Sequence, residues 1–252
     1  MTEKSGNRYF SKICVSVGTK DPQEAIERLV RGHRSEGDTL EAIAAKCGVA
    51  AIIEEPLSFE GGIFHLSDDR IVVKLNSCSN HRRRKFTLAH EIGHLLLSSL
   101  NKKSDALKCK ESAGLERACD AIAAELLMPA GQVRMMVAEL KFSSPQNLRI
   151  LASRFGVSLL VAARRVHEDL HLWTRHIGMW KCHSLPQELW FVGKRPWGIR
   201  SPEFAAFEAA KNSSQVVRSF DVTRSGDRVE PISLELLNLG GDYILGLVGV
   251  VS

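Results

Sequence analysis

The sequence has no long apolar run and no paired cysteines, and both absences restrict the class of protein. No stretch approaches the roughly 20 apolar residues that a helix needs to cross a bilayer. The first ten residues are polar and contain no apolar segment typical of a signal peptide. The six cysteines are dispersed, without a C-x-x-C pair, which favours reduced thiols over a disulfide framework. We therefore expect a cytoplasmic protein and not a secreted or membrane-spanning one.

Charge of one sign is not in large excess, and repeats are missing as well. A formal net charge of +5 over 252 residues permits contact with nucleic acid or an acidic partner but does not require it. We find no internal repeat and no low-complexity segment. A chain of this length forms one large domain or two to three small ones and can bury a core. The composition is that of an ordinary globular protein.

Helical and strand-like patterns are both present, which predicts an α+β fold. Turn and cap residues at Asp21, Gly48 and Ser67–Arg70 separate the patterns. The helices are expected over residues 21–30, 39–47, about 79–98, about 114–127, 130–170 and 202–211. The strands are expected over residues 50–54, 62–66, 71–75 and in short apolar runs after 177, ending with Tyr243–Val251.

An H-E-x-x-H pattern lies inside the apolar helix that is expected to begin at Ser79 or Asn80. On a helix, positions i and i+4 share a face, so the imidazoles of His90 and His94 converge on one point. A tetrahedral zinc ion takes such a pair of nitrogen ligands, and Glu91 beside it can act as a base on a metal-bound water. The pattern predicts a hydrolytic metal site.

The next helix supplies the groups that such a site still needs. A catalytic zinc requires a third protein ligand and an open position for water. Glu116 follows His94 by 22 positions, enough for a loop and a return helix. Asp120 lies one turn further on the same face, where it can accept a hydrogen bond from the free ring N–H of a ligand histidine. Cys119 is expected to be a small buried residue that points away from the site.

These two helices resemble those of the ImmA/IrrE family of metallopeptidases. The similarity rests on Thr87–Leu96 and on the run from Glu116 to Met128-Pro129, and it extends over about residues 20–170. Cys119 and Ile122 depart from the usual alanine and phenylalanine of the pattern. The resemblance implies a zinc endopeptidase of the thermolysin-like class with His90, His94 and Glu116 as ligands; manganese or iron are alternatives.

The resemblance also implies a partner. Family members typically act on a repressor with a helix-turn-helix domain and so relieve repression, after stress or in mobile elements. We therefore expect a cytoplasmic protein substrate of this kind, encoded nearby. The strand with Ile71, Val72, Val73 and Lys74 is a candidate edge for an extended substrate. His65 is a candidate for oxyanion stabilisation, although a surface strand residue is the better interpretation.

Two other functions remain open. One is a non-catalytic regulator that keeps the metal and binds a repressor, against which the presence of Glu91 argues. The other is direct DNA binding through residues 148–166, which resemble a helix-turn-helix. The second helix there, Ser158–Ala163, is too apolar for a DNA groove, so we interpret the segment as a packing element. Likewise, a solvated face is the better interpretation of the basic run His81–Lys85.

The expected organisation has three parts. Residues 1–140 form the zincin-like metallopeptidase domain, in which a small sheet packs beside the H-E-x-x-H helix. Residues 141–175 form a helical segment, and residues 176–252 form a small mixed C-terminal domain of unknown role.

Overall fold

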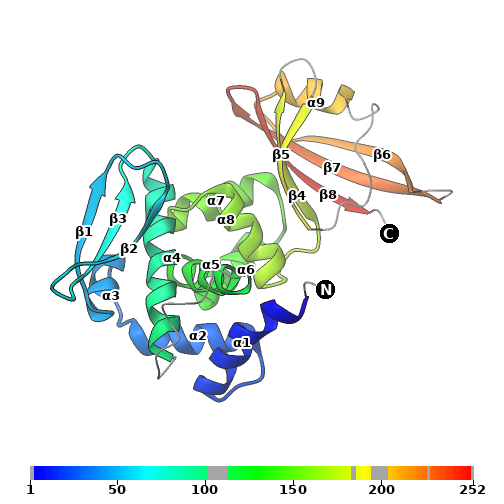
Figure 1. Ribbon diagram of the computed structural model, residues 1–252. Helices are drawn as coiled ribbons and strands as arrows, with labels where there is room; N and C mark the ends of the chain where they lie inside the picture. The colour runs from blue at the N-terminus through cyan, green and yellow to red at the C-terminus, as the bar shows by residue number, and fades with distance from the viewer. Residues whose placement is uncertain (1–2, 101–112, 183–185, 194–203, 226–227, 251–252) are drawn as a thin grey trace. The chain divides into compact units, whose positions relative to one another are not determined.

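The computed structural model describes residues 3–100, 113–182, 186–193, 204–225 and 228–250 (Figure 1). It divides into two compact units, Met1–Ala130 with Phe155–Val157 and Gly131–Arg154 with Ser158–Ser252. Each unit contains one described sheet beside helices, so the mixed α+β class is confirmed. A compact unit need not coincide with a functional domain, and the predicted boundaries at 140 and 175 stay a prediction.

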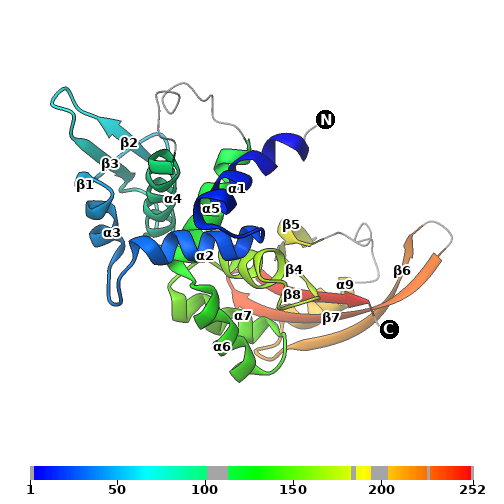
Figure 2. The same ribbon diagram turned by 90° about the horizontal axis from the view of Figure 1, so that it is seen from below.

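Three helices open the first unit: α1 (Glu3–Val17), α2 (Pro22–His33) and α3 (Leu40–Lys46). The predicted helices at 21–30 and 39–47 are confirmed. Asp21 caps α2, since its carboxylate accepts a 2.8 Å hydrogen bond from the backbone N–H of Gln23. The expectation that Asp21 begins the first helix is wrong, because α1 precedes it. Helix α1 buries Ile13 and lies beside α5 (Ala113–Leu127) (Figure 2).

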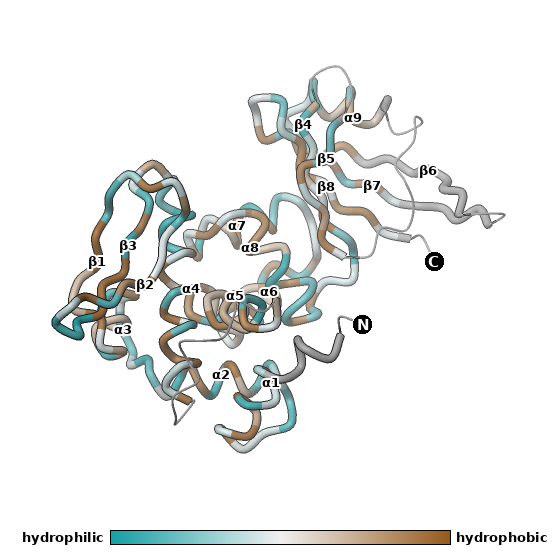
Figure 3. Tube along the Cα trace, in the orientation of Figure 1, coloured by the Kyte–Doolittle hydropathy of each residue, from teal (hydrophilic) through white to brown (hydrophobic). Residues whose placement is uncertain are grey.

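The sheet of the first unit contains β1 (Val49–Glu55), β2 (Gly61–His65) and β3 (Ile71–Asn76). The predicted hairpin is confirmed, since β2 and β3 pair antiparallel. β1 returns parallel to β3, so the strand order is β1-β3-β2. Hydrophobic stretches mark β1 and β3 in Figure 3, and the side chains of Val72 and Val73 are buried.

The central place of β3 overturns one prediction. The strand that carries Ile71, Val72, Val73 and Lys74 has a partner strand on both sides, so its backbone groups are already paired. An extended peptide can add only to an edge strand. The prediction that these four residues form a substrate-binding edge is therefore wrong. The sequence did not reveal this, because the parallel pairing of β3 with β1 joins two segments that no local pattern connects.

Two long helices, α4 (His81–Leu100) and α5 (Ala113–Leu127), form the centre of the first unit. They pack closely because residue 93 is glycine: a Cβ there would lie 3.1 Å from both the Cα and the carbonyl oxygen of Cys119. Ile92, Leu96 and Ile122 are fully buried around the contact. The close approach is what allows side chains of the two helices to meet.

The second unit begins with helices and ends with a sheet. Its elements are α6 (Ala130–Leu140), α7 (Pro145–Phe155), α8 (Leu159–Arg164), the π-helix η1 (Arg165–Asp169), β4 (His176–Cys182), β5 (Pro186–Val192), α9 (Phe204–Lys211), β6 (Val217–Ser225), β7 (Arg228–Gly240) and β8 (Tyr243–Val250). The strands run antiparallel in the order β5-β4-β8-β7-β6. The C-terminal apolar strand is buried as predicted, between β4 and β7; Val251 lies outside the described residues.

The core of this second sheet is apolar and aromatic. The indole of Trp180 on β4 is 1% exposed and packs edge-on against Phe207 of α9 and Phe191 of β5, with centroid separations of 5.2 and 6.3 Å. Ile244 and Leu236 complete the cluster. Such contacts explain why this part folds, but they supply no reactive group.

Within the described residues, no single helix has both the length and the apolarity to cross a bilayer. The bent pair α5 and α6, with a 62° angle between its halves, reaches the threshold only when the two are taken together.

Candidate metal centre

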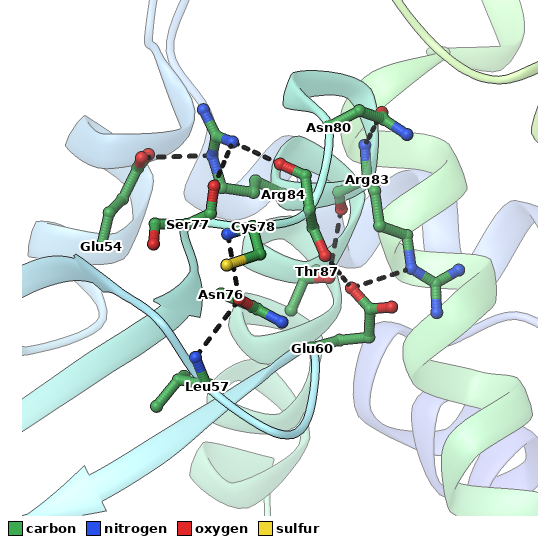
Figure 4. Close-up of polar contacts among 11 residues, drawn as sticks. Glu54, Leu57, Glu60, Asn76, Ser77, Cys78, Asn80, Arg83, Arg84 and Thr87 are labelled. Atoms are coloured by element: carbon green, nitrogen blue, oxygen red, sulfur yellow. Dashed lines mark hydrogen bonds and ion pairs between the residues drawn. The ribbon is translucent and has the colours of Figure 1, made fainter.

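The helix that carries the H-E-x-x-H pattern is fixed at its first turn. The side chain of Asn80 accepts a 3.0 Å hydrogen bond from the backbone N–H of Arg83, so Asn80, one of the two predicted caps, begins α4. Figure 4 shows the polar contacts that join this end of α4 to the sheet. Arg84 pairs with Glu54 of β1 at 3.1 Å, and Arg83 pairs with Glu60 at 3.3 Å.

These ion pairs change the interpretation of the basic run at the start of α4. The side chain of Arg84 is 22% exposed, and its guanidinium also donates to the carbonyls of Ser77 and Ser79. Arg83 and Arg84 therefore hold the helix to the sheet. The prediction of a solvated face is wrong for Arg84, whereas the side chain of Arg83 is 54% exposed and agrees with it. These contacts fix the direction of α4 relative to the sheet, and so the direction of the histidines that it carries.

His90 and His94 lie one turn apart on α4 and face each other. Their Nε2 atoms are 3.1 Å apart, and the ring centroids are 4.9 Å apart with an interplanar angle of 66°. The side chains are 16% and 24% exposed, so solvent reaches them only partly. Two ring nitrogens at this separation can share one cation.

Glu116 and Asp120 of α5 complete the cluster. Glu116 places Oε2 3.1 Å from Nε2 of His90 and Oε1 3.5 Å from Nε2 of His94. Asp120 Oδ1 lies 2.9 Å from Nδ1 of His90. When the Nδ1–H of His90 donates to Asp120, its Nε2 keeps a free lone pair that points at the cluster. The structure thus brings together the four residues that the sequence analysis selected.

The donor atoms fit a metal ion. Four donors at about 2.0–2.2 Å from one zinc ion lie roughly 3.3 Å from one another in a tetrahedron. The three separations among His90, His94 and Glu116 are 3.1, 3.1 and 3.5 Å. Oε1 of Glu116 is buried and has no hydrogen-bond partner among the described residues. A divalent cation would satisfy this oxygen and both imidazole lone pairs together.

The electrostatics of the cluster also favour a cation. Burial lowers the pKa of His90, but its hydrogen bond to Asp120 and the charges of Asp120, Glu91 and Glu116 outweigh it, so the net pKa is raised. The carboxylate of Glu91 is on the same helix and only 9% exposed. The surroundings of the two histidines therefore carry negative charge that a metal ion would neutralise.

Cys119 is the residue of this cluster whose position the sequence analysis missed. The side chain is buried, as expected, but it does not point away from the site. Its Sγ lies within 4.8 Å of a ring nitrogen of His90 and of His94, in a group that could hold a metal ion. Burial, and then the charges of the nearby carboxylates, raise the pKa of the Cys119 thiol. The available signal was its position three residues after Glu116, on the same helical face.

The remaining predicted residues lie elsewhere. His65 is exposed on β2 opposite Ile71, which agrees with a surface strand residue. The helix–glycine–helix segment exists as α7, Gly156 and α8. In the π-helix that follows, the side chain of Arg165 is fully buried and pairs with Asp169 at 3.4 Å. That buried charge cannot contact a DNA phosphate.

Comparisons with known proteins match the segment that contains this centre. Residues 44–167 match the family described as Peptidase_M78, the IrrE N-terminal-like domain. The radiation response metalloprotease IrrE of Deinococcus radiodurans is 36% identical over 87 residues, a match that covers 32% of this chain. The match covers 26% of that relative, about a quarter of its length.

A solved structure shares the fold over most of the chain. The Mycobacterium tuberculosis transcriptional regulator superimposes with a TM-score of 0.57 at 15% identity, covering 96% of this chain and 80% of its own. At that identity the likeness concerns the fold alone.

Proposed function

Since its segment 44–167 belongs to the ImmA/IrrE family of metallopeptidases, we propose that this protein is a zinc-dependent endopeptidase that cleaves a regulatory protein in the cytoplasm. The observation that carries the proposal is the convergence of His90, His94 and Glu116, with their donor atoms 3.1–3.5 Å apart, beside the buried carboxylate of Glu91. The zincin-like arrangement, with an H-E-x-x-H helix beside a small sheet, is part of the same proposal.

The residues divide the chemistry between binding and proton transfer. His90, His94 and Glu116 would hold the metal, and Asp120 orients the ring of His90 through its Nδ1–H. When bound, zinc makes water acidic enough to lose a proton near neutral pH and polarises a carbonyl. Glu91 accepts the proton of the attacking water and passes it to the leaving amine. The low exposure of Glu91 keeps bulk water from competing for that proton.

An extended substrate would align along β2. The backbone N–H of Asn76 donates to the carbonyl of Glu60, and the N–H of Leu66 donates to the carbonyl of Arg70. These two hydrogen bonds determine which residues of β2 direct their backbone groups toward β3 and which direct them away. By that alternation, Ile63 points its N–H and carbonyl away from β3, toward the free edge. Glu60 immediately precedes β2 and is held to α4 by Arg83, which keeps the edge strand beside the H-E-x-x-H helix.

The proposed substrate is a helix-turn-helix repressor encoded nearby, whose cleavage would relieve repression. The proposal rests on the family membership, and the likeness to a transcriptional regulator is one of fold alone. The alternative is a regulator that keeps the metal and binds the repressor without cutting it. The buried base Glu91 favours the peptidase, because a binding protein has no use for it.

The decisive experiment compares wild type with Glu91→Gln. Glu91 is not a ligand in this proposal, so both proteins should hold about one divalent metal per chain by elemental analysis. Only wild type should cleave the neighbouring repressor, with the variant slower by at least about 10²-fold. Equal cleavage by both proteins would refute the role of Glu91. Metal in both and cleavage in neither would favour the binding-only regulator.

A further inference from the structure

One ligand-type side chain beside the histidines has no part in the proposed mechanism. Cys119 is 0% exposed, and its Sγ lies within 4.8 Å of a ring nitrogen of both His90 and His94. Thiolates are among the preferred ligands of zinc. A buried sulfur at this place therefore needs an explanation beyond filling space.

The packing of the two helices holds this sulfur at the site. Gly93, next to His94, has no side chain, so the backbone of α5 at Cys119 lies directly against α4. A Cβ at residue 93 would be 3.3 Å from the Cβ of Cys119. On α5, Cys119 follows Glu116 by three residues and precedes Asp120, and both of those residues reach the histidines. Cys119 is thus flanked on its own helix by residues of the cluster.

We propose that Cys119 Sγ is a fourth protein ligand of the metal, beside His90, His94 and Glu116. This inference rests on the proposed metal site. Sulfur at about 2.3 Å and nitrogen at about 2.0–2.1 Å from one tetrahedral zinc ion lie roughly 3.6 Å apart. The observed limit of 4.8 Å exceeds this separation by about 1.2 Å, and rotation of the short cysteine side chain can supply the contraction. The thiol proton leaves to solvent as the sulfur–metal bond forms.

The fourth ligand has a consequence for the resting protein. Four protein ligands close a tetrahedral zinc site, whereas a catalytic site keeps one position for water. Cys119 is fully buried, whereas the side chain of Glu116 is 39% exposed. With Cys119 as a ligand the resting centre would be closed, and the thiolate would have to give up its place to a water before hydrolysis.

Cobalt substitution tests the sulfur ligand directly. Wild-type protein loaded with Co²⁺ should show the near-ultraviolet charge-transfer band of a cobalt–thiolate bond. Cys119→Ala and the better size match Cys119→Ser should bind cobalt without that band. Cys14→Ala is the matched control, because Cys14 is also a buried cysteine of the first unit, and it should keep the band. Zinc affinity of Cys119→Ala, measured against a chelating dye, should fall at least about 10-fold.

Azide tests whether the site is closed. The anion should shift the visible cobalt bands of Cys119→Ala, which has an open position, and leave those of wild type unchanged. A wild-type cobalt protein without the thiolate band, or one that binds azide as the variant does, overturns the inference and leaves the peptidase proposal intact. A wild type that takes up no cobalt or zinc overturns both.

Discussion

Each of the two units contains a pair of histidines with nearly the same ring geometry. His90 and His94 have centroids 4.9 Å apart at 66°, and His167 and His176 have centroids 5.4 Å apart at 68°. The difference lies in what surrounds them. Carboxylates on α5 contact the first pair and raise the pKa of His90 despite its burial. The geometry of two rings alone does not distinguish a metal centre from a packing contact.

In the second pair, the ring of His167 forms a hydrogen bond whose partner is a backbone group. Nδ1 of His167 lies 2.9 Å from the carbonyl oxygen of Trp173, to which its N–H donates. Nδ1 of His176 is buried without a hydrogen-bond partner among the described residues. Burial, and then the neighbouring His167, lower the pKa of His176. The surroundings of His176 therefore favour its neutral form, whereas the carboxylates around the first pair favour a positive charge.

The largest expected effect is a loss of zinc affinity when an imidazole of the first pair is removed, compared with the same removal in the second pair. His90→Ala should lower the zinc affinity by more than about 100-fold, since loss of a mere outer partner costs about 10–100-fold. His167→Ala is the matched control and should keep the metal content of wild type. The measurement is metal bound per chain after dialysis against a weak chelator. Loss of metal from His167→Ala would mean that the second pair also binds metal.

The next effect concerns the close packing of the second pair. Gly193 has φ +102°, and a Cβ there would lie 2.2 Å from Nδ1 of His176 and 2.7 Å from Nε2 of His167. Gly193→Ala should lower the free energy of unfolding by more than the about 1–3 kcal/mol of backbone strain. Gly240→Ala is the control: it has φ +85° with open space around it and so carries the strain alone. Chemical denaturation compares the two, and equal losses would rule out the steric contact with the histidines.

A smaller loss of zinc affinity is expected when Asp120 is changed, the carboxylate that contacts His90 and has no counterpart at the second pair among the described residues. Asp120→Asn keeps an acceptor for Nδ1 of His90 but removes the charge. Zinc affinity should fall by about 10-fold for Asp120→Asn and by up to about 100-fold for Asp120→Ala, measured by competition with a chelating dye. Unchanged affinity in both variants would show that His90 needs no partner to hold its orientation.

The contrast between the units also shows what a sequence can reveal. The positions of His90 and His94 follow from helical spacing, and Asp120 follows from the same spacing applied to the next helix. Both rules are local. The central place of β3 depends on its parallel pairing with β1, across 22 positions between Val49 and Ile71, which no periodicity encodes. Spacing places Cys119 on the same helical face as Glu116, but its nearness to the histidines depends on the close approach of α5 at Gly93, which is a property of packed helices and not of one helix.

The smallest expected effect is a pH dependence of the second unit. The pKa of His176 is lowered in the folded state, so the unfolded chain binds its proton first as the pH falls below the ordinary value of 6.5. The stability is therefore complete above that value and is lost progressively as the pH falls toward the folded-state pKa. His176→Gln should reduce this loss, seen as a smaller change in the free energy of unfolding between about pH 8 and about pH 5. An identical pH dependence in wild type and variant would show that His176 protonates as freely in the folded protein as in the unfolded chain.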